Sequence, residues 1–358
     1  MKERKTAIIF TEEERAITAA AIKEELLKIN PTAIVIIIGM MEIRTRVIAD
    51  FISNLANINL NPSKIVTKVK QRVNYKNINN IPRSSLTVKQ TSAYRNMENI
   101  LLRYDPSLVI TVGIGATQEV CAVRNKLKST FKVLTVVDEY ALNRNVIYDY
   151  VDAYMVPNMA VKTEMVNCYV DEDKIFIANI PIMNNVKESI DKNTARNKLN
   201  IDTRMPTLLL VVAPNDNEAF KSQIEVLDKY KNQYNIRVFV YDNKEAVSVA
   251  NSYNLKVYTD LDELNKLYSV ADIVLSCPFS AIIEPAFRRG ILVALSTPQT
   301  ALEEKVFNYL TDKVAPCENN NRLIYFLDKY PREEYENIRK EGEKLKLRDP
   351  NEFFSLFF

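Results

Sequence analysis

One carboxylate in the first half of the chain stands where a catalytic base is expected. Asp138 directly follows the apolar run Val133-Leu134-Thr135-Val136-Val137, which reads as a buried strand. Open parallel sheets bind ligands outside the carboxyl ends of their strands, so Asp138 is predicted to face a ligand. A carboxylate in that place could act as a general base. It could equally be a structural carboxylate or a helix N-cap, and the residue types alone leave both interpretations open.

An acidic group follows the first apolar run of the chain. Glu12, Glu13 and Glu14 precede Arg15, directly after the strand-like segment 6–10. Acidic side chains at the start of a helix are favoured by the positive end of the helix dipole. We therefore expect a solvated helix start, and the alternative is that this acidic group with Arg15 binds a ligand.

A long stretch of the chain is basic. No Asp or Glu occurs from Phe51 to Met97, and apolar residues alternate with the basic ones. At about 1 kcal/mol for each basic residue near an anionic leaflet, the stretch is predicted to contact a membrane surface. The alternatives are a solvated loop or a patch for acidic proteins or RNA, although a net charge of +3 gives no reason to expect nucleic acid. The predicted membrane residues are Lys64, Lys68, Lys70, Arg72, Lys76 and Arg83.

Several residue types are rare or absent. The chain has no histidine, no tryptophan and only five glycines. Histidine is the commonest general base and metal ligand, so we expect no metal site and no resident cofactor. The four cysteines are widely spaced, which is typical of reduced, buried thiols in a cytoplasmic protein. We expect neither a signal peptide nor a membrane span, since no run reaches the ~18 apolar residues that a span needs.

Strands and helices alternate in both halves. Apolar runs predict strands at 6–10, 33–38, 107–112 and 133–137, and again at 207–212, 237–241, 255–258, 273–277 and 292–295. Intervening segments predict helices, among them 12–28, 118–127, 261–270, 280–289 and about 332–345. This alternation predicts an α/β protein with doubly wound parallel sheets. A length of 358 residues favours two domains.

A set of short motifs resembles a known family when taken in order. They include Val136-Val137-Asp138, Val151-Asp152-Ala153-Tyr154, Lys174-Ile175 to Ile180-Pro181-Ile182, Ala271-Asp272 to Pro278, and Glu284 to Gly290. The chain in these motifs is similar to the GT-B glycosyltransferases of the monogalactosyldiacylglycerol synthase and processive diacylglycerol glucosyltransferase family. The resemblance implies two Rossmann-like domains, with parallel sheets facing a central cleft. It implies domains at 1–183 (acceptor side) and 184–330 (nucleotide-sugar side), with 331–358 as a C-terminal helix packing back on the first. The alternative to this packing is that the aromatic tail 353–358 is a second membrane anchor.

The resemblance also assigns residues to a sugar-nucleotide donor. It implies Asp138 as a base and Glu284 on the nucleotide ribose. The other donor-side positions are Pro278, Ser280, Glu303 and Glu304. The family's G-x-G-H turn aligns with Glu12–Arg15, with Arg15 at the histidine position. Its H-x-x-W motif is missing, and its glycine-rich donor turn reads Ala213-Pro214-Asn215-Asp216.

Two functions follow from these departures. The changed loops favour a non-catalytic relative, which acts as a binding or scaffold protein at a membrane or in a protein assembly. The alternative is an active enzyme that transfers a hexose from a UDP-sugar to a membrane lipid acceptor. Either protein is expected to be cytoplasmic, with peripheral contact to the inner face of the membrane.

Overall fold

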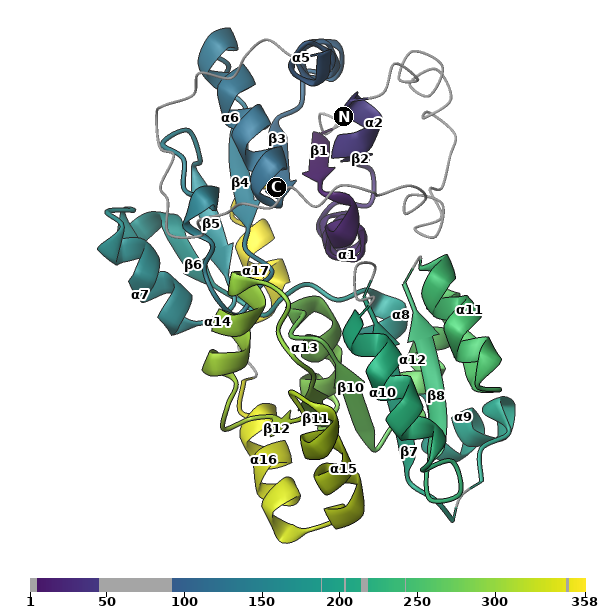
Figure 1. Ribbon diagram of the computed structural model, residues 1–358. Coiled ribbons are helices and arrows are strands. Elements are labelled where there is room, and N and C mark those ends of the chain that lie inside the picture. The colour runs from purple at the N-terminus through teal and green to yellow at the C-terminus, as the bar shows by residue number, and fades with distance from the viewer. Residues whose placement is uncertain are drawn as a thin grey trace. The chain divides into compact units, whose positions relative to one another are not determined.

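The computed structural model describes residues 5–44, 92–187, 189–202, 204–213, 218–241, 243–345 and 348–358. The chain divides into two compact units (Figure 1). The first unit comprises Met1–Met183 with Leu347–Phe358, and the second unit comprises Asn184–Lys346. Each unit contains one six-stranded parallel sheet with helices packed on it, so the predicted α/β class is confirmed.

The sheet of the first unit has the order β2-β1-β3-β4-β5-β6. Its strands are β1 (Thr6–Thr11), β2 (Ile34–Gly39), β3 (Leu108–Val112), β4 (Lys132–Val136), β5 (Ala153–Val156) and β6 (Ile175–Ile177). The register pairs Thr11 with Gly39 and with Val112, and Val112 with Val136. The carboxyl ends of four strands are therefore level, and the residues that follow them share one edge of the sheet.

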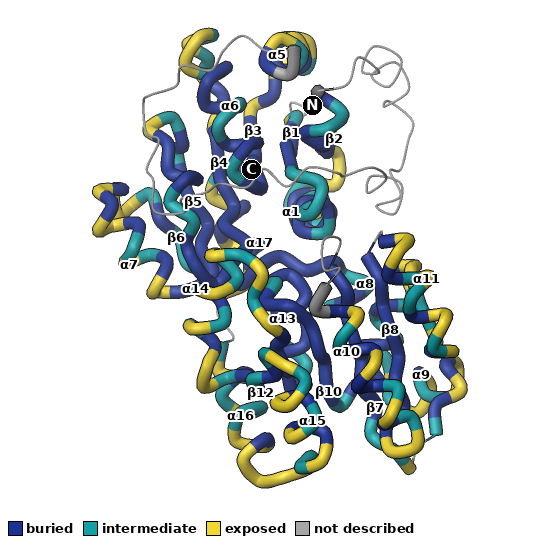
Figure 2. The backbone as a smooth tube through the Cα atoms, viewed as in Figure 1, coloured by how far each residue is buried: buried dark blue, intermediate teal, exposed yellow. Residues whose placement is uncertain are grey.

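Helices and short 3-10 turns connect these strands. They are η1 (Glu13–Arg15), α1 (Ala16–Ile29), α2 (Met40–Arg44), α5 (Ser92–Tyr104), α6 (Ile114–Leu127), η3 (Arg144–Val146), α7 (Met159–Asn167), η4 (Glu172–Lys174) and α17 (Pro350–Phe354). Ile8 and Phe10 of β1 share a buried cluster with residues of α5 and α6. The strands are buried almost throughout (Figure 2), as parallel strands covered on both faces must be.

The sheet of the second unit has the order β12-β11-β10-β7-β8-β9. Its strands are β7 (Thr207–Val212), β8 (Asn235–Val240), β9 (Lys256–Tyr258), β10 (Ile273–Ser276), β11 (Leu292–Leu295) and β12 (Ala315–Pro316). Its helices are α8 (Asn184–Lys187), α9 (Lys192–Leu199), α10 (Glu218–Asp228), α11 (Lys244–Ser252), α12 (Leu261–Val270), α13 (Ser280–Arg288), α14 (Ala301–Tyr309), α15 (Asn320–Lys329) and α16 (Glu333–Glu343). Leu208 and Leu210 pack with Phe220, Ile224 and aromatic residues of α15 and α16 in the core.

The segment after residue 330 differs from the sequence-based expectation. That expectation placed all of 331–358 on the first domain, but α16 contacts β11 and α13 of the second unit. The reason is a close helix contact, in which Gly342 lies directly against the ring of Phe287. Only the last residues belong to the first unit, where α17 contacts α1.

The aromatic tail packs into the first unit. Phe353, Phe354 and Phe358 are buried, and the ring of Phe353 lies 5.3 Å from that of Phe176 in β6. Lys5 Nζ donates a hydrogen bond of 2.8 Å to the main-chain oxygen of Phe358. No helix in the described part of the chain is long and apolar enough to span a membrane. The four cysteines are buried thiols outside any disulfide, as their spacing predicts.

Replacement of Gly342 by alanine should loosen α16 from the second unit. The added Cβ would lie 2.6 Å from a ring carbon of Phe287, which forces a shift in a packed core. We expect a loss of about 1–3 kcal/mol in the free energy of unfolding, measured with urea. Asn337→Ala, on an exposed position of the same helix, is the control and should gain a few tenths of a kcal/mol. A Gly342→Ala protein as stable as this control would contradict the packing.

Candidate functional site

Asp138 lies at the carboxyl edge of the first unit, two residues beyond β4. It is 2% exposed, and both of its carboxylate oxygens have partners. Oδ2 accepts a hydrogen bond of 2.8 Å from Thr18 Oγ1 in α1. Oδ1 forms an ion pair with Arg15 Nη1. The candidate base is therefore held by two side chains, and the catalytic role predicted for it stays a prediction.

Arg15 joins two carboxylates from the segment after β4. Besides Asp138 it contacts Glu139, with Nη2 3.3 Å from Oε1. The Arg15 side chain is only 14% exposed. Burial lowers the pKa of its guanidinium, but Asp138 and Glu139 outweigh this and raise that pKa above its ordinary value. Arg15 is thus a permanent cation, at the position where the resembled family carries a histidine.

The turn Glu12–Arg15, called here the acidic turn, reaches the segments after three neighbouring strands. Glu12 Oε1 accepts a hydrogen bond of 2.7 Å from the backbone N–H of Gly115 at the start of α6. Glu13 Oε1 accepts one from the backbone N–H of Met41 in α2. These carboxylates satisfy N–H groups that helix starts leave without intrahelical partners. The expected helix start is present and none of its residues is buried, but its side chains also bond to α2, α6 and the segment after β4.

Gly113 makes the contact between the acidic turn and α6 feasible. Its φ is +104°, a conformation that side chains disfavour. A Cβ at this position would lie 2.6 Å from Glu12 Oε2. In the sequence, the pattern Gly113-Ile114-Gly115 after a predicted strand is the available indication of this close approach.

Glu12 is a carboxylate of this turn whose proton affinity is strongly changed by its surroundings. Burial raises its pKa from 4.5 to about 7, and the nearby charge of Glu14 adds to the effect. The charge of Arg15 and the hydrogen bond from Gly115 lower the pKa in part. The sequence does not distinguish Glu12 from its acidic neighbours, since burial is a tertiary property.

In the second unit, three donor-side positions follow β10. Pro278 and Ser280 are buried in the segment that starts α13, and Glu284 lies one turn further along that helix. Glu284 is 3% exposed and its Oε1 accepts a hydrogen bond of 2.7 Å from Arg288 Nε. The start of α13 has no side-chain cap at Phe279.

The other two donor-side positions lie in α14, after β11. Thr300 accepts a hydrogen bond of 3.2 Å from the backbone N–H of Glu303. The Glu303 carboxylate in turn accepts one of 2.6 Å from the backbone N–H of Gln299. This arrangement resembles a capping box, so Glu303 stabilises the helix start. Glu304 is exposed on the same helix.

Strands β10 and β11 are neighbours in the sheet, so the segments carrying these positions share its carboxyl edge. Ser296 directly follows β11 at this edge and is fully buried. Its hydroxyl has no hydrogen-bond partner among the described residues. The edge therefore offers one polar group that a ligand could satisfy.

Some predicted positions lie outside the described residues. These are the membrane-contacting Lys64, Lys68, Lys70, Arg72, Lys76 and Arg83, together with Pro214, Asn215 and Asp216 of the expected donor turn. Their roles stay predictions.

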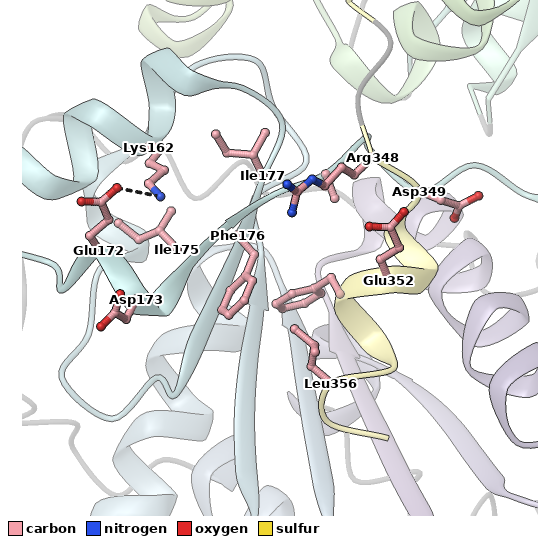
Figure 3. Close-up of a pocket in the computed structure, with 12 residues that line it drawn as sticks. Lys162, Glu172, Asp173, Ile175, Phe176, Ile177, Arg348, Asp349, Glu352 and Leu356 are labelled. Atoms are coloured by element: carbon pink, nitrogen blue, oxygen red, sulfur yellow. Dashed lines mark ion pairs between the residues drawn. The ribbon is translucent and has the colours of Figure 1, made fainter.

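A hollow of about 850 Å³ lies in the first unit between β6 and α17. Figure 3 shows Phe176, Leu356, Arg348 and Glu352 among the side chains that line it. Lys162 pairs with Glu172 on the α7 side, at 3.0 Å. None of the sequence-predicted site residues lines this hollow.

Comparison with known families supports the resemblance. Residues 18–182 match the family described as Monogalactosyldiacylglycerol (MGDG) synthase. The matched range runs from α1 to the segment after β6 and includes Thr18 and Asp138. The similarity predicted from the motifs is confirmed over this part of the chain.

Curated relatives include two kinds of transferase. The processive diacylglycerol beta-glucosyltransferase of Staphylococcus carnosus is 29% identical over 112 residues, 31% of this chain and 28% of the relative. That of Bacillus licheniformis is 20% identical over 230 residues, 62% of this chain and 59% of the relative. A UDP-N-acetylglucosamine--N-acetylmuramyl-(pentapeptide) pyrophosphoryl-undecaprenol N-acetylglucosamine transferase of Finegoldia magna is 23% identical over 191 residues, 51% and 50% of the two chains. The chain thus spans less than two thirds of the length of each.

Solved structures share the fold along nearly the whole chain. The Staphylococcus aureus MnaA–UDP complex has a TM-score of 0.66 at 11% identity, covering 98% of this chain and 95% of its own. UDP-GlcNAc 2-epimerase from Neisseria meningitidis bound to UDP-GlcNAc has a TM-score of 0.61 at 16% identity, covering 97% of this chain and 95% of its own. Acinetobacter baumannii MurG has a TM-score of 0.60 at 9% identity, covering 99% of both chains. These similarities confirm the predicted GT-B fold of two Rossmann-like domains.

Replacement of Glu12 by glutamine should change how stability depends on pH. Glu12 binds its proton more tightly in the folded protein, so its contribution is fully present below pH 4.5 and is lost as the pH rises toward 7. Glutamine keeps the hydrogen-bond acceptor and removes the buried charge. We expect Glu12→Gln to be more stable than wild type at pH 8, on the order of 2 kcal/mol, and equal to it near pH 4. Glu14→Gln is the control and should retain most of the wild-type pH dependence; a pH-independent effect of Glu12→Gln would count against a buried, titrating Glu12.

Replacement of Arg15 by methionine should strongly destabilise the first unit. Asp138 and Glu139 would remain buried without their cation, and breaking a buried ion pair costs about 3–5 kcal/mol. Adding Asp138→Asn should recover part of the loss in a urea double-mutant cycle. Arg204→Met, which breaks an exposed pair with Asp202, is the control and should cost at most about 1 kcal/mol. Equal effects of the two arginine replacements would show that the Arg15 pair is not structurally important.

Proposed function

Because residues 18–182 match the monogalactosyldiacylglycerol synthase family and the whole chain has the GT-B fold, we propose that this protein transfers a hexose from a UDP-sugar to the hydroxyl of a lipid acceptor. The family match carries the proposal. It covers the unit that, by the resemblance, handles the acceptor.

A UDP-sugar donor is supported by the structural neighbours. The MnaA structure contains UDP and the meningococcal epimerase contains UDP-GlcNAc, and both align along almost all of this chain. The carboxyl edge of the second unit offers matching chemistry. The uncapped start of α13 presents a helix N-terminus of the kind that favours phosphate groups. Glu284 and the unpaired hydroxyl of Ser296 supply groups for a ribose or sugar hydroxyl.

A lipid acceptor is supported by the curated relatives, which are named as glucosyltransferases of diacylglycerol. An enzyme with such an acceptor works at a membrane surface. We place the protein in the cytoplasm, with the basic residues between Lys64 and Arg83 in contact with anionic lipid of the inner face.

The transfer is a substitution at the anomeric carbon of the hexose. The acceptor oxygen forms a bond to that carbon, and the bond from the carbon to the phosphate oxygen breaks. UDP leaves with the electron pair of the broken bond, and the acceptor proton passes to a base. A positioned base contributes typically 10²–10⁴-fold to such a step.

A second candidate function is a non-catalytic binding or scaffold protein of the same fold. The observation that favours it is the ion pair between Arg15 and Asp138, because both oxygens of the predicted base are occupied. Such a protein would bind a UDP-sugar, a lipid or a protein partner without transferring the sugar.

Thermal unfolding with UDP and UDP-glucose tests the donor. A ligand at a hundred times its dissociation constant should raise the free energy of unfolding by about 2.7 kcal/mol. Glu284→Gln should remove most of this stabilisation, and Glu225→Gln, an exposed residue of α10, should keep it. Transfer of labelled glucose to diacylglycerol in vesicles then separates the two candidates. Stabilisation with transfer supports the enzyme, stabilisation without transfer supports the binding protein, and no stabilisation by any UDP-sugar overturns the proposed donor.

A further inference from the structure

Glu12 has the position of a group that acts on a ligand. It directly follows β1 at the carboxyl edge of the first sheet, level with the ends of β2, β3 and β4. Ligands of open parallel sheets bind outside this edge. The residue also occupies the start of the loop where the resembled family has its G-x-G-H turn.

The Glu12 side chain is fixed at one oxygen. Its backbone N–H donates to the carbonyl of Val112 at 3.1 Å, and its Oε1 accepts from Gly115 N–H at 2.7 Å. Two contacts from the β3–α6 segment therefore set its orientation. Catalytic groups need such fixed orientation, because a small misplacement costs much of the rate.

The second oxygen of Glu12 distinguishes it from Asp138. Among the described residues, Oε2 has no hydrogen-bond partner, and the residue is only partly buried. The Asp138 oxygens both have partners, Arg15 and Thr18. Proton transfer requires a carboxylate oxygen with a free lone pair, and Glu12 Oε2 has one.

The charges around Glu12 suit this role. The Glu13 carboxylate accepts a hydrogen bond from the backbone N–H of Met41. The guanidinium of Arg15 forms ion pairs with Asp138 and Glu139. Glu14 is the remaining charged residue of the acidic turn. Burial and Glu14 raise the pKa of Glu12 to about 7, near the working pH at which a general base is most effective.

We propose that Glu12, and not Asp138, is the general base that accepts the proton of the acceptor hydroxyl. The inference rests on the proposed function. In the step, the hydroxyl proton moves to Glu12 Oε2 while the acceptor oxygen bonds to the anomeric carbon and UDP departs with the electron pair. The protonated carboxyl then returns its proton to water. Arg15 with Asp138 and Glu139 is a positioning group, which holds the acidic turn against the strand ends.

The test is the pH profile of glucose transfer from UDP-glucose to diacylglycerol vesicles, between pH 5 and 9. The wild type should lose activity below a midpoint near pH 7, as Glu12 becomes protonated. Glu12→Gln should lower kcat/KM at pH 8 by about 100-fold or more and abolish this midpoint, with UDP binding unchanged. Glu14→Gln, the matched control on the same turn, should keep activity at pH 8 and move the midpoint to lower pH, because a neighbouring negative charge is gone.

The outcomes separate the base from the overall function. An active wild type whose Glu12→Gln variant stays within about threefold, with the acid midpoint in place, overturns the role of Glu12 alone. A wild type that binds UDP but transfers no glucose overturns the proposed enzyme and the base with it. Glu12→Asp keeps the carboxylate on a shorter side chain and should restore part of the activity and the midpoint. If circular dichroism shows that Glu12→Gln is poorly folded, the comparison of Glu12→Asp with the wild type decides. A Glu12 with a purely structural role would give no pH midpoint of activity that depends on its carboxylate.

Discussion

The ion pair between Arg15 and Asp138 is the constraint on which the first unit depends. It joins residues 123 positions apart and closes the edge where four parallel strands end. A buried guanidinium requires its carboxylates, and buried carboxylates require their cation. The same turn carries Glu12 and Glu13, whose carboxylates accept hydrogen bonds from backbone N–H groups at the starts of α6 and α2. The polar atoms that remain available to a ligand at this edge are therefore those that these ion pairs and hydrogen bonds leave unbonded.

The second unit shows how local structure and site chemistry compete for the same residues. Glu303 matches a donor-side position of the resembled family, yet its carboxylate closes a capping arrangement at the start of α14. Glu284 is buried and paired within its own helix. Ser296 shows the opposite case, since its buried hydroxyl has no partner in the described part of the unit. A ligand at this edge would meet one open group and several that are already bonded.

Strong local patterns were enough to predict many elements. The predicted helix 261–270 and strand 292–295 match α12 and β11, because Asp260 caps the helix and a continuous apolar run forms the strand. Helix α6 begins four residues earlier than predicted, because Gly113 turns the chain directly from strand to helix. The strands β5, β6 and β12 were not predicted.

The sequence by itself determined the α/β class, the GT-B resemblance and the position of Asp138 after a strand. These follow from periodicity and from motifs of neighbouring residues, which are properties of short segments. Tertiary structure alone decided the partners of that carboxylate, the bonds that tie the acidic turn to α2 and α6, and the placement of α16 in the second unit. Each depends on burial or on contacts between distant segments. Charge pairing and proton affinity arise only when folding removes water from those groups, so the role of Glu12 could be inferred only from the folded chain.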